Sequence, residues 1–227
     1  GGRGMAGRDA QREGAWWGWE GRGGLDGGGH LDAAYDVAAP DAKWDLGGKL
    51  NVCYNCVDRH VEAGHGDKVA FYWEGEPEDD RRAFTFADLQ KSVVRAANGL
   101  KKVGVKKGTH VAIYMGMIPA LPVAMLACAR IGAPFTVVFG GFSGEALSDR
   151  MNDMQCEVML TQDEGWRRGH RVPLKANADA GMDSSPTIKT CVVVQRTSGE
   201  VTSKEGRYIW APGVMKGVSD EPASGPC

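Results

Sequence analysis

A short turn with two adjacent glycines could bind an anion. The segment Phe139-Gly140-Gly141-Phe142-Ser143 joins an apolar stretch typical of a buried strand to an expected helix start. Free backbone N–H groups and the helix dipole favour negative charge there, and glycine lets a ligand approach the backbone. The alternative is a tight structural turn whose glycines need positive φ. The spacing matches neither the dinucleotide fingerprint nor a P-loop, so both interpretations stay open.

A second candidate is the densest short basic cluster of the chain, which directly follows an expected strand at residues 158–161. Guanidinium groups bind phosphate oxygens in a bidentate manner, and an imidazole can add a donor or a charge. We expect this cluster at the ligand-bearing edge of a sheet, with a solvated basic loop as the alternative. The cluster consists of Arg167, Arg168, Gly169, His170 and Arg171.

Two further segments carry site-like residues without the full pattern. Cys53 and Cys56 have partial zinc or redox spacing, but a tetrahedral site lacks a clear fourth ligand. The apolar spacing of Val52, Cys56 and Val57 instead favours a small buried thiol on a helix. Residues 197–204 have phosphate-loop residue types in the wrong order and are interpreted as a solvated turn. We therefore assign no catalytic residue and no metal ligand.

Composition limits the class of protein. Lys and Arg number 27 against 29 Asp and Glu, so no overall field favours nucleic acid or an anionic membrane. The most apolar stretch, residues 117–129, is too short to span a bilayer. No secretory signal is visible, and the six cysteines fit free thiols in a reducing compartment. We predict a cytoplasmic protein, with import into an organelle and the oligomeric state left open.

The pattern of apolar residues predicts alternating strands and helices. This order implies right-handed crossovers and an α/β fold with a mainly parallel sheet and helices on both faces, whose ligands bind at the carboxyl ends of the strands. A polar stretch over residues 163–180 is given no element. The expected strands are 69–73, 83–86, 110–115, 134–139, 158–161 and 188–195, and the expected helices are 86–103, capped by Thr85, 117–130, and one capped by Ser143.

Several blocks in register closely resemble AMP-forming acetyl-CoA synthetases, of the adenylate-forming superfamily. The resemblance is collinear from about residue 40 to about residue 210, which is far more specific than any single motif, and it favours acetate over propionate. It is carried by residues 43–51, 54–60, 118–133, 137–143 and 163–175.

The resemblance implies an acetate-CoA ligase, which joins acetate to ATP as acetyl-AMP with Mg and then transfers the acetyl group to CoA. It implies that Phe139, Gly140 and Gly141 form the groove for the CoA adenine. It also implies that the turn from Arg167 through Arg168 and Gly169 to His170 contacts the CoA phosphates. His170 departs from the family, where Arg or Lys is usual at that place.

The resemblance also sets the expected domain organisation. We expect a disordered Gly-rich extension at 1–40, a partial N-terminal α/β domain at 41–210 and an irregular tail at 211–227. The family's Ser/Thr/Gly-rich phosphate loop, its ribose-binding aspartate and its lid lysine have no counterpart here, so we expect a fragment without independent catalysis. The alternatives are a non-catalytic CoA-binding, nucleotide-binding or partner-binding module and, third, a small dinucleotide-dependent oxidoreductase, which the missing fingerprint disfavours.

Overall fold

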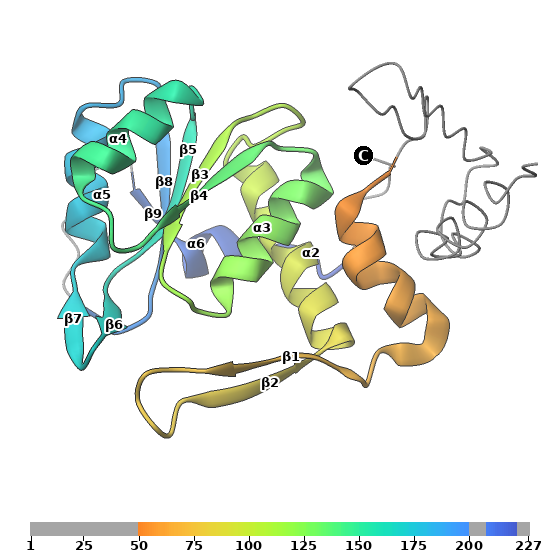
Figure 1. Ribbon diagram of the computed structural model, residues 1–227. Coiled ribbons are helices and arrows are strands. Elements are labelled where there is room, and N and C mark those ends of the chain that lie inside the picture. Colours follow the sequence, from red (N-terminus) through yellow and green to blue (C-terminus); the bar gives the residue numbers. More distant parts are fainter. Residues whose placement is uncertain (1–49, 200–207, 222–227) are drawn as a thin grey trace, which may run out of the picture. The chain divides into compact units, whose positions relative to one another are not determined.

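The computed structural model describes residues 50–199 and 208–221 (Figure 1). The chain divides at residue 50, and every element below belongs to the second unit, Asn51–Cys227. The extension expected to be disordered, residues 1–40, lies outside the described residues. The domain boundary at residue 41 therefore stays a prediction.

A five-stranded sheet forms the centre of the second unit, and all of its neighbouring strands are parallel. This confirms the expected α/β fold. The strand order is β4-β3-β5-β8-β9. The strands are β3 (Val111–Met115), β4 (Phe135–Phe139), β5 (Val158–Gln162), β8 (Thr190–Val194) and β9 (Tyr208–Trp210). β9 is a strand that the sequence did not predict, since the last expected strand was 188–195.

Helices cover both faces of the sheet because alternate side chains of each strand point to opposite faces. In β3, Val111, Ile113 and Met115 are buried in one apolar cluster, whereas Ala112 and Tyr114 are buried in the other. The first cluster includes buried residues of α2 (Phe86–Lys102), α3 (Ala120–Ile131) and α6 (Ala211–Met215). The second includes buried residues of α4 (Gly144–Asp153) and α5 (Leu174–Asp183).

Two stretches differ from expectation. Residues 163–180, expected to be a polar stretch without an element, contain a hairpin and most of α5, whose buried face repeats at helical spacing through Leu174, Ala178 and Met182. Residues 211–227, expected to be irregular, begin with α6. Val214 of this short helix is buried beside α2, and that burial orders a segment whose composition favours a loop.

The two expected helix caps are confirmed, whereas the helix expected from residue 117 begins at Ala120. Thr85 and Asp88 form a capping box at the start of α2, in which the Thr85 hydroxyl accepts the Asp88 N–H at 3.1 Å. Ser143 caps α4 in the same way, with its hydroxyl accepting the Ala146 N–H at 3.3 Å. These bonds satisfy backbone donors that the first helical turn leaves without partners.

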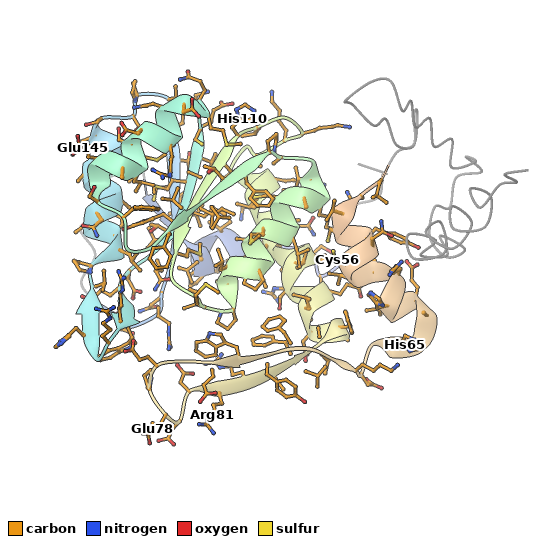
Figure 2. The ribbon with its side chains drawn as sticks, in the orientation of Figure 1. Cys56, His65, Glu78, Arg81, His110 and Glu145 are labelled. Atoms are coloured by element: carbon orange, nitrogen blue, oxygen red, sulfur yellow. The ribbon has the colours of Figure 1, made fainter. Side chains whose placement is uncertain are left out.

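Two antiparallel hairpins accompany the sheet. The first pairs β1 (Val69–Glu74) with β2 (Arg81–Thr85), and Glu78 lies near its tip (Figure 2). The second pairs β6 (Gly165–Arg167) with β7 (His170–Val172). Its two turn residues, Arg168 and Gly169, have φ of 53° and 75°, as a two-residue hairpin turn that follows the strand twist requires.

A helical segment precedes β1, made of η1 (Tyr54–Asp58) and η2 (Val61–His65). It corrects the expectation for its cysteines: Cys56 is exposed (Figure 2), and the buried thiol belongs to Cys53. Cys53, Cys56, Cys128 and Cys156 are free thiols. In that same part of the chain, no helix combines the length and apolarity needed to cross a membrane.

Candidate nucleotide site

The strand order creates a crevice between β3 and β5. These two strands are neighbours, but β3 leads into α3 on one face of the sheet and β5 leads, through the second hairpin, into α5 on the other. Loops that part in this way leave a ligand-binding gap beyond the carboxyl ends of the strands. A cavity of about 270 Å³ lies at this edge. Its lining includes residues 115–118, 139–141 and 165–167, Gln162, Arg196, and residues 73–76 of the first hairpin.

Two segments named by the sequence analysis meet in this cavity. The Arg167 guanidinium lies over the Phe139 ring, 5.4 Å from its centroid, and the Phe139 side chain is 58% exposed. A Cβ atom on Gly141 would overlap the Arg167 Nη1 atom and would lie 2.8 Å from the Phe139 Cε1 atom. The glycine turn and the first arginine of the basic cluster therefore form one surface.

The turn requires glycine because neighbouring atoms leave little room for a Cβ atom. The segment is a tight turn, in which Phe142 donates its N–H to the Phe139 carbonyl at 3.0 Å, but neither Gly140 nor Gly141 has a positive φ, so that part of the expectation is wrong. A Cβ atom on Gly140 would lie 3.1 Å from the Leu174 Cδ2 atom and 3.3 Å from the Met115 carbonyl oxygen. The turn packs closely on its underside and against Arg167, which any larger residue at Gly141 must displace.

Of the remaining residues of the basic cluster, Arg168 and Gly169 form the turn of the second hairpin, and His170 and Arg171 lie on β7. Arg168 and His170 are exposed, and neither lines the cavity. Gly169 donates its N–H to the Glu76 Oε1 atom at 2.6 Å. The structure thus brings Arg167 to the glycine turn and joins Gly169 to the loop of the first hairpin, whereas Arg168 and His170 are exposed outside the cavity lining.

Further contacts tie the first hairpin to this edge, and sequence reasoning missed them. Trp73 donates its indole N–H to the Met117 carbonyl at 2.7 Å. Arg196 pairs with Asp80, and its guanidinium lies 5.1 Å from the centroid of a Trp73 ring. The only available signal was the position of Arg196 just after a strand, because nothing local relates it to a hairpin 116 residues earlier.

A buried side-chain amide connects two loops at the floor of the crevice. Gln162, at the end of β5, accepts the Gly116 N–H at 2.8 Å and donates to the Glu164 carbonyl at 2.7 Å. These bonds connect the loop after β3 to the loop after β5. Because both ends of the side chain have partners, the two walls of the crevice are held at a fixed separation.

Two more arginine–aromatic pairs extend the surface around the cavity. Arg150 lies 4.5 Å from the Phe142 ring centroid, and Arg171 lies 5.3 Å from a Trp166 ring centroid. Exposed rings offer flat apolar faces, and guanidinium groups offer charge and planar donors. This combination suits a ligand that carries both a flat base and anionic groups.

Residues 57–224 match the family described as AMP-binding enzyme. The chain belongs to this family. It is 50% identical over 182 residues to the acetyl-coenzyme A synthetase of Rubrobacter xylanophilus, covering 80% of this chain and 28% of that protein. It is 51% identical over 176 residues to the enzyme of the same name from Halorhodospira halophila, covering 78% and 27%. It is 53% identical over 171 residues to that of Streptomyces avermitilis, covering 75% and 26%.

These relatives confirm the resemblance seen in the sequence blocks. They also show how much of the relatives the resemblance covers: this AMP-binding family member spans little more than a quarter of the length of the curated relatives it matches. The described part of the chain contains no group of three or more His, Cys, Asp or Glu side chains that could hold a metal ion.

Proposed function

We propose that the chain is part of an AMP-forming acetate-CoA ligase and that it binds the nucleotide portion of CoA at the carboxyl edge of its sheet. The complete ligase would convert acetate and ATP to acetyl-AMP and pyrophosphate, after which the CoA thiol displaces AMP. The names of the relatives support the reaction. The observation that carries the binding site is the meeting of Arg167, Phe139 and Gly141 in one cavity.

The parts of this site suit the two chemical halves of the ligand. Phe139 presents an exposed ring on which a purine can stack, and Gly140 and Gly141 leave the backbone beside it uncovered. Arg167 brings a permanent positive charge to the same surface. Arg168, Gly169 and His170 then meet the phosphates at the mouth, where the hairpin turn is exposed.

Acyl-adenylate chemistry is assigned to the complete ligase. The described residues contain no group of three or more His, Cys, Asp or Glu side chains that could hold a metal ion, and we derive no step through Mg. Most of the catalysis of adenylate formation comes from positioning the reactants and from hydrogen-bond donors aimed at the transferring group. We assign neither of these two roles to this chain. The expected result is that the 227-residue chain releases no pyrophosphate from ATP when acetate is added; acetate-dependent release at an enzyme-like rate would refute this assignment.

The binding proposal is tested by calorimetric titration of the full chain with adenosine 3′,5′-bisphosphate, which carries a purine and two phosphates. Wild type should bind, and Arg167→Gln should lose roughly tenfold or more in affinity because a charge-assisted contact is removed. Arg95→Gln is the matched control, since Arg95 lies on α2 and pairs with Asp220. Absence of wild-type binding, or equal losses in the two variants, would overturn the proposal.

A further inference from the structure

The hydroxyl of Tyr114 lies directly beneath the glycine turn. Tyr114 is fully buried in β3, and its hydroxyl donates to the Phe142 carbonyl at 2.8 Å, with the Gly140 carbonyl at 3.4 Å. Asn177 of α5 donates its side-chain N–H to the same hydroxyl at 3.4 Å. Burial raises the pKa of Tyr114, so the hydroxyl keeps its proton and acts as a donor.

These bonds control the direction of the backbone N–H groups in the turn. A peptide unit is planar and trans, so its N–H points opposite to its C=O; no peptide bond in the described residues is cis. The Gly140 carbonyl shares a peptide plane with the Gly141 N–H, and the Phe142 carbonyl shares one with the Ser143 N–H. Holding both carbonyls toward the buried hydroxyl therefore turns both N–H groups away from the core.

We propose that Tyr114 is a positioning residue for nucleotide binding, because its hydroxyl fixes the peptide planes of the 140–143 turn and so directs the Gly141 and Ser143 amides outward to the ligand. The inference rests on the proposed function of this cavity. Ser143 is also the N-cap residue of α4, and the N-terminus of a helix favours anions. Tyr114 touches no ligand itself and acts through the turn.

The test replaces Tyr114 by Phe in the full chain, which removes the hydroxyl and keeps the buried ring. Without ligand, hydrogen exchange of the Phe142 amide, which donates to the Phe139 carbonyl at 3.0 Å within the turn, should become about three- to tenfold faster, because the loss of the Tyr114 hydrogen bond loosens the turn. The affinity for adenosine 3′,5′-bisphosphate should fall by a similar factor, roughly three- to tenfold. The exchange measurement needs no ligand and separates this inference from the proposed function.

Thr161→Val is the matched control. It also removes a buried hydroxyl from the sheet, since the Thr161 side chain donates to the Tyr114 carbonyl at 2.9 Å, but that bond joins β5 to β3 and leaves the turn untouched. Thr161→Val should lower thermal stability without changing exchange at 140–143 or nucleotide affinity. Equal behaviour of the Tyr114 and Thr161 variants in these two readouts would show a general structural role and overturn the inference.

Asn177→Ala gives a second test if the Tyr114 variant does not fold. It removes the group that orients the hydroxyl and should change exchange and affinity in the same direction by about two- to threefold. Unchanged exchange of the turn in either folded variant overturns the inference. If Arg167→Gln weakens binding and Tyr114→Phe does not, the inference fails alone; if wild type does not bind, the proposed function and the inference fail together.

Discussion

Directly after β5, the buried Asp163 carboxylate accepts the backbone N–H of Arg196, which follows β8, at 2.8 Å. It also accepts the N–H groups of Glu164 at 2.7 Å and Thr197 at 3.0 Å. One side chain thus satisfies donors from the loops after two neighbouring strands. The position of Arg196, which binds the first hairpin through Asp80, depends on this carboxylate.

Asp163→Ala should therefore destabilise the fold strongly. Removal of the buried carboxylate leaves three partly buried backbone donors without this partner, which costs roughly 2–4 kcal/mol of unfolding free energy. Urea denaturation followed by tryptophan fluorescence measures the change. Asp149→Ala, at an exposed position on α4, is the control and should shift the midpoint little. Matching midpoints for the two variants would contradict a role for Asp163 in holding the loops.

Gly141→Ala should weaken nucleotide binding with little loss of stability. The added Cβ atom displaces the end of the flexible Arg167 side chain from the Phe139 ring, so the fold adapts while the site changes. We expect a roughly three- to tenfold lower affinity for adenosine 3′,5′-bisphosphate, measured by calorimetry. Gly213→Ala on α6 meets no atom within 4 Å and is the control. An unchanged affinity for the Gly141 variant would mean that the Arg167 position is unimportant.

His170→Arg should raise nucleotide affinity a few-fold. His170 is exposed at the start of β7, and arginine would place a permanent charge and a planar donor group there. His65→Arg adds the same charge on the helical segment before β1 (Figure 2) and should leave affinity unchanged. Calorimetry near neutral pH makes the comparison. No gain for the His170 variant would remove the idea that this position limits phosphate binding.

The rate of alkylation should distinguish the exposed thiol of Cys56 from the buried thiols of Cys53 and Cys128. Burial raises the pKa of Cys53 to about 11 and that of Cys128 to about 12, and for Cys53 a hydrogen bond from Arg130 opposes only part of the rise. A pKa about two units above the ordinary value cuts the reactive thiolate near pH 8 roughly a hundredfold. Mass spectrometry after iodoacetamide treatment should find exposed Cys56 modified well before Cys53 and Cys128. The reverse order would contradict the burial pattern of the η1 segment.

The capping box should make stability fall in acid. Hydrogen bonds from the Thr85 side chain and backbone hold the pKa of Asp88 below its ordinary value of 3.8. A group whose pKa is lower in the folded state stabilises fully above its unfolded pKa, and this stabilisation is lost as the pH falls through the folded value. Asp88→Asn should therefore lose less thermal stability than wild type between about pH 5 and about pH 3. Asp149→Asn is the charge-matched control, and parallel curves for all three proteins would exclude the coupling.

The sequence predicted the elements whose signals are local. The Thr85 cap, the apolar face of α2 and the continuous apolar strands β3 and β4 were all expected, because capping, period and burial act over a few residues. The second hairpin and α5 were missed because the residues around them are mostly polar. α6 and β9 were missed for another reason: each is ordered by packing against a distant element.

The candidate site was predicted in part for the same reason. Glycines and a basic cluster are visible in the sequence, and their placement after strands put both at one edge of the sheet. The contribution of Trp73 and Glu76 was not visible, because it depends on the first hairpin folding against a loop that follows much later in the chain. The role of the Tyr114 hydroxyl could not be predicted either, since burial of the aromatic ring is enough to account for a tyrosine in an apolar strand.

The order of the strands also bears on how the chain is made. β3 is the first strand of the parallel sheet to leave the ribosome, yet it lies inside the sheet and needs β4 on one side and β5 on the other. Each later strand is added beyond β5, so the nascent sheet grows outward from a centre that emerges first. A nascent chain that has released β3 and β4 but not yet β5 from the ribosome would expose an unpaired β3 edge, and release of β5 would cover that edge.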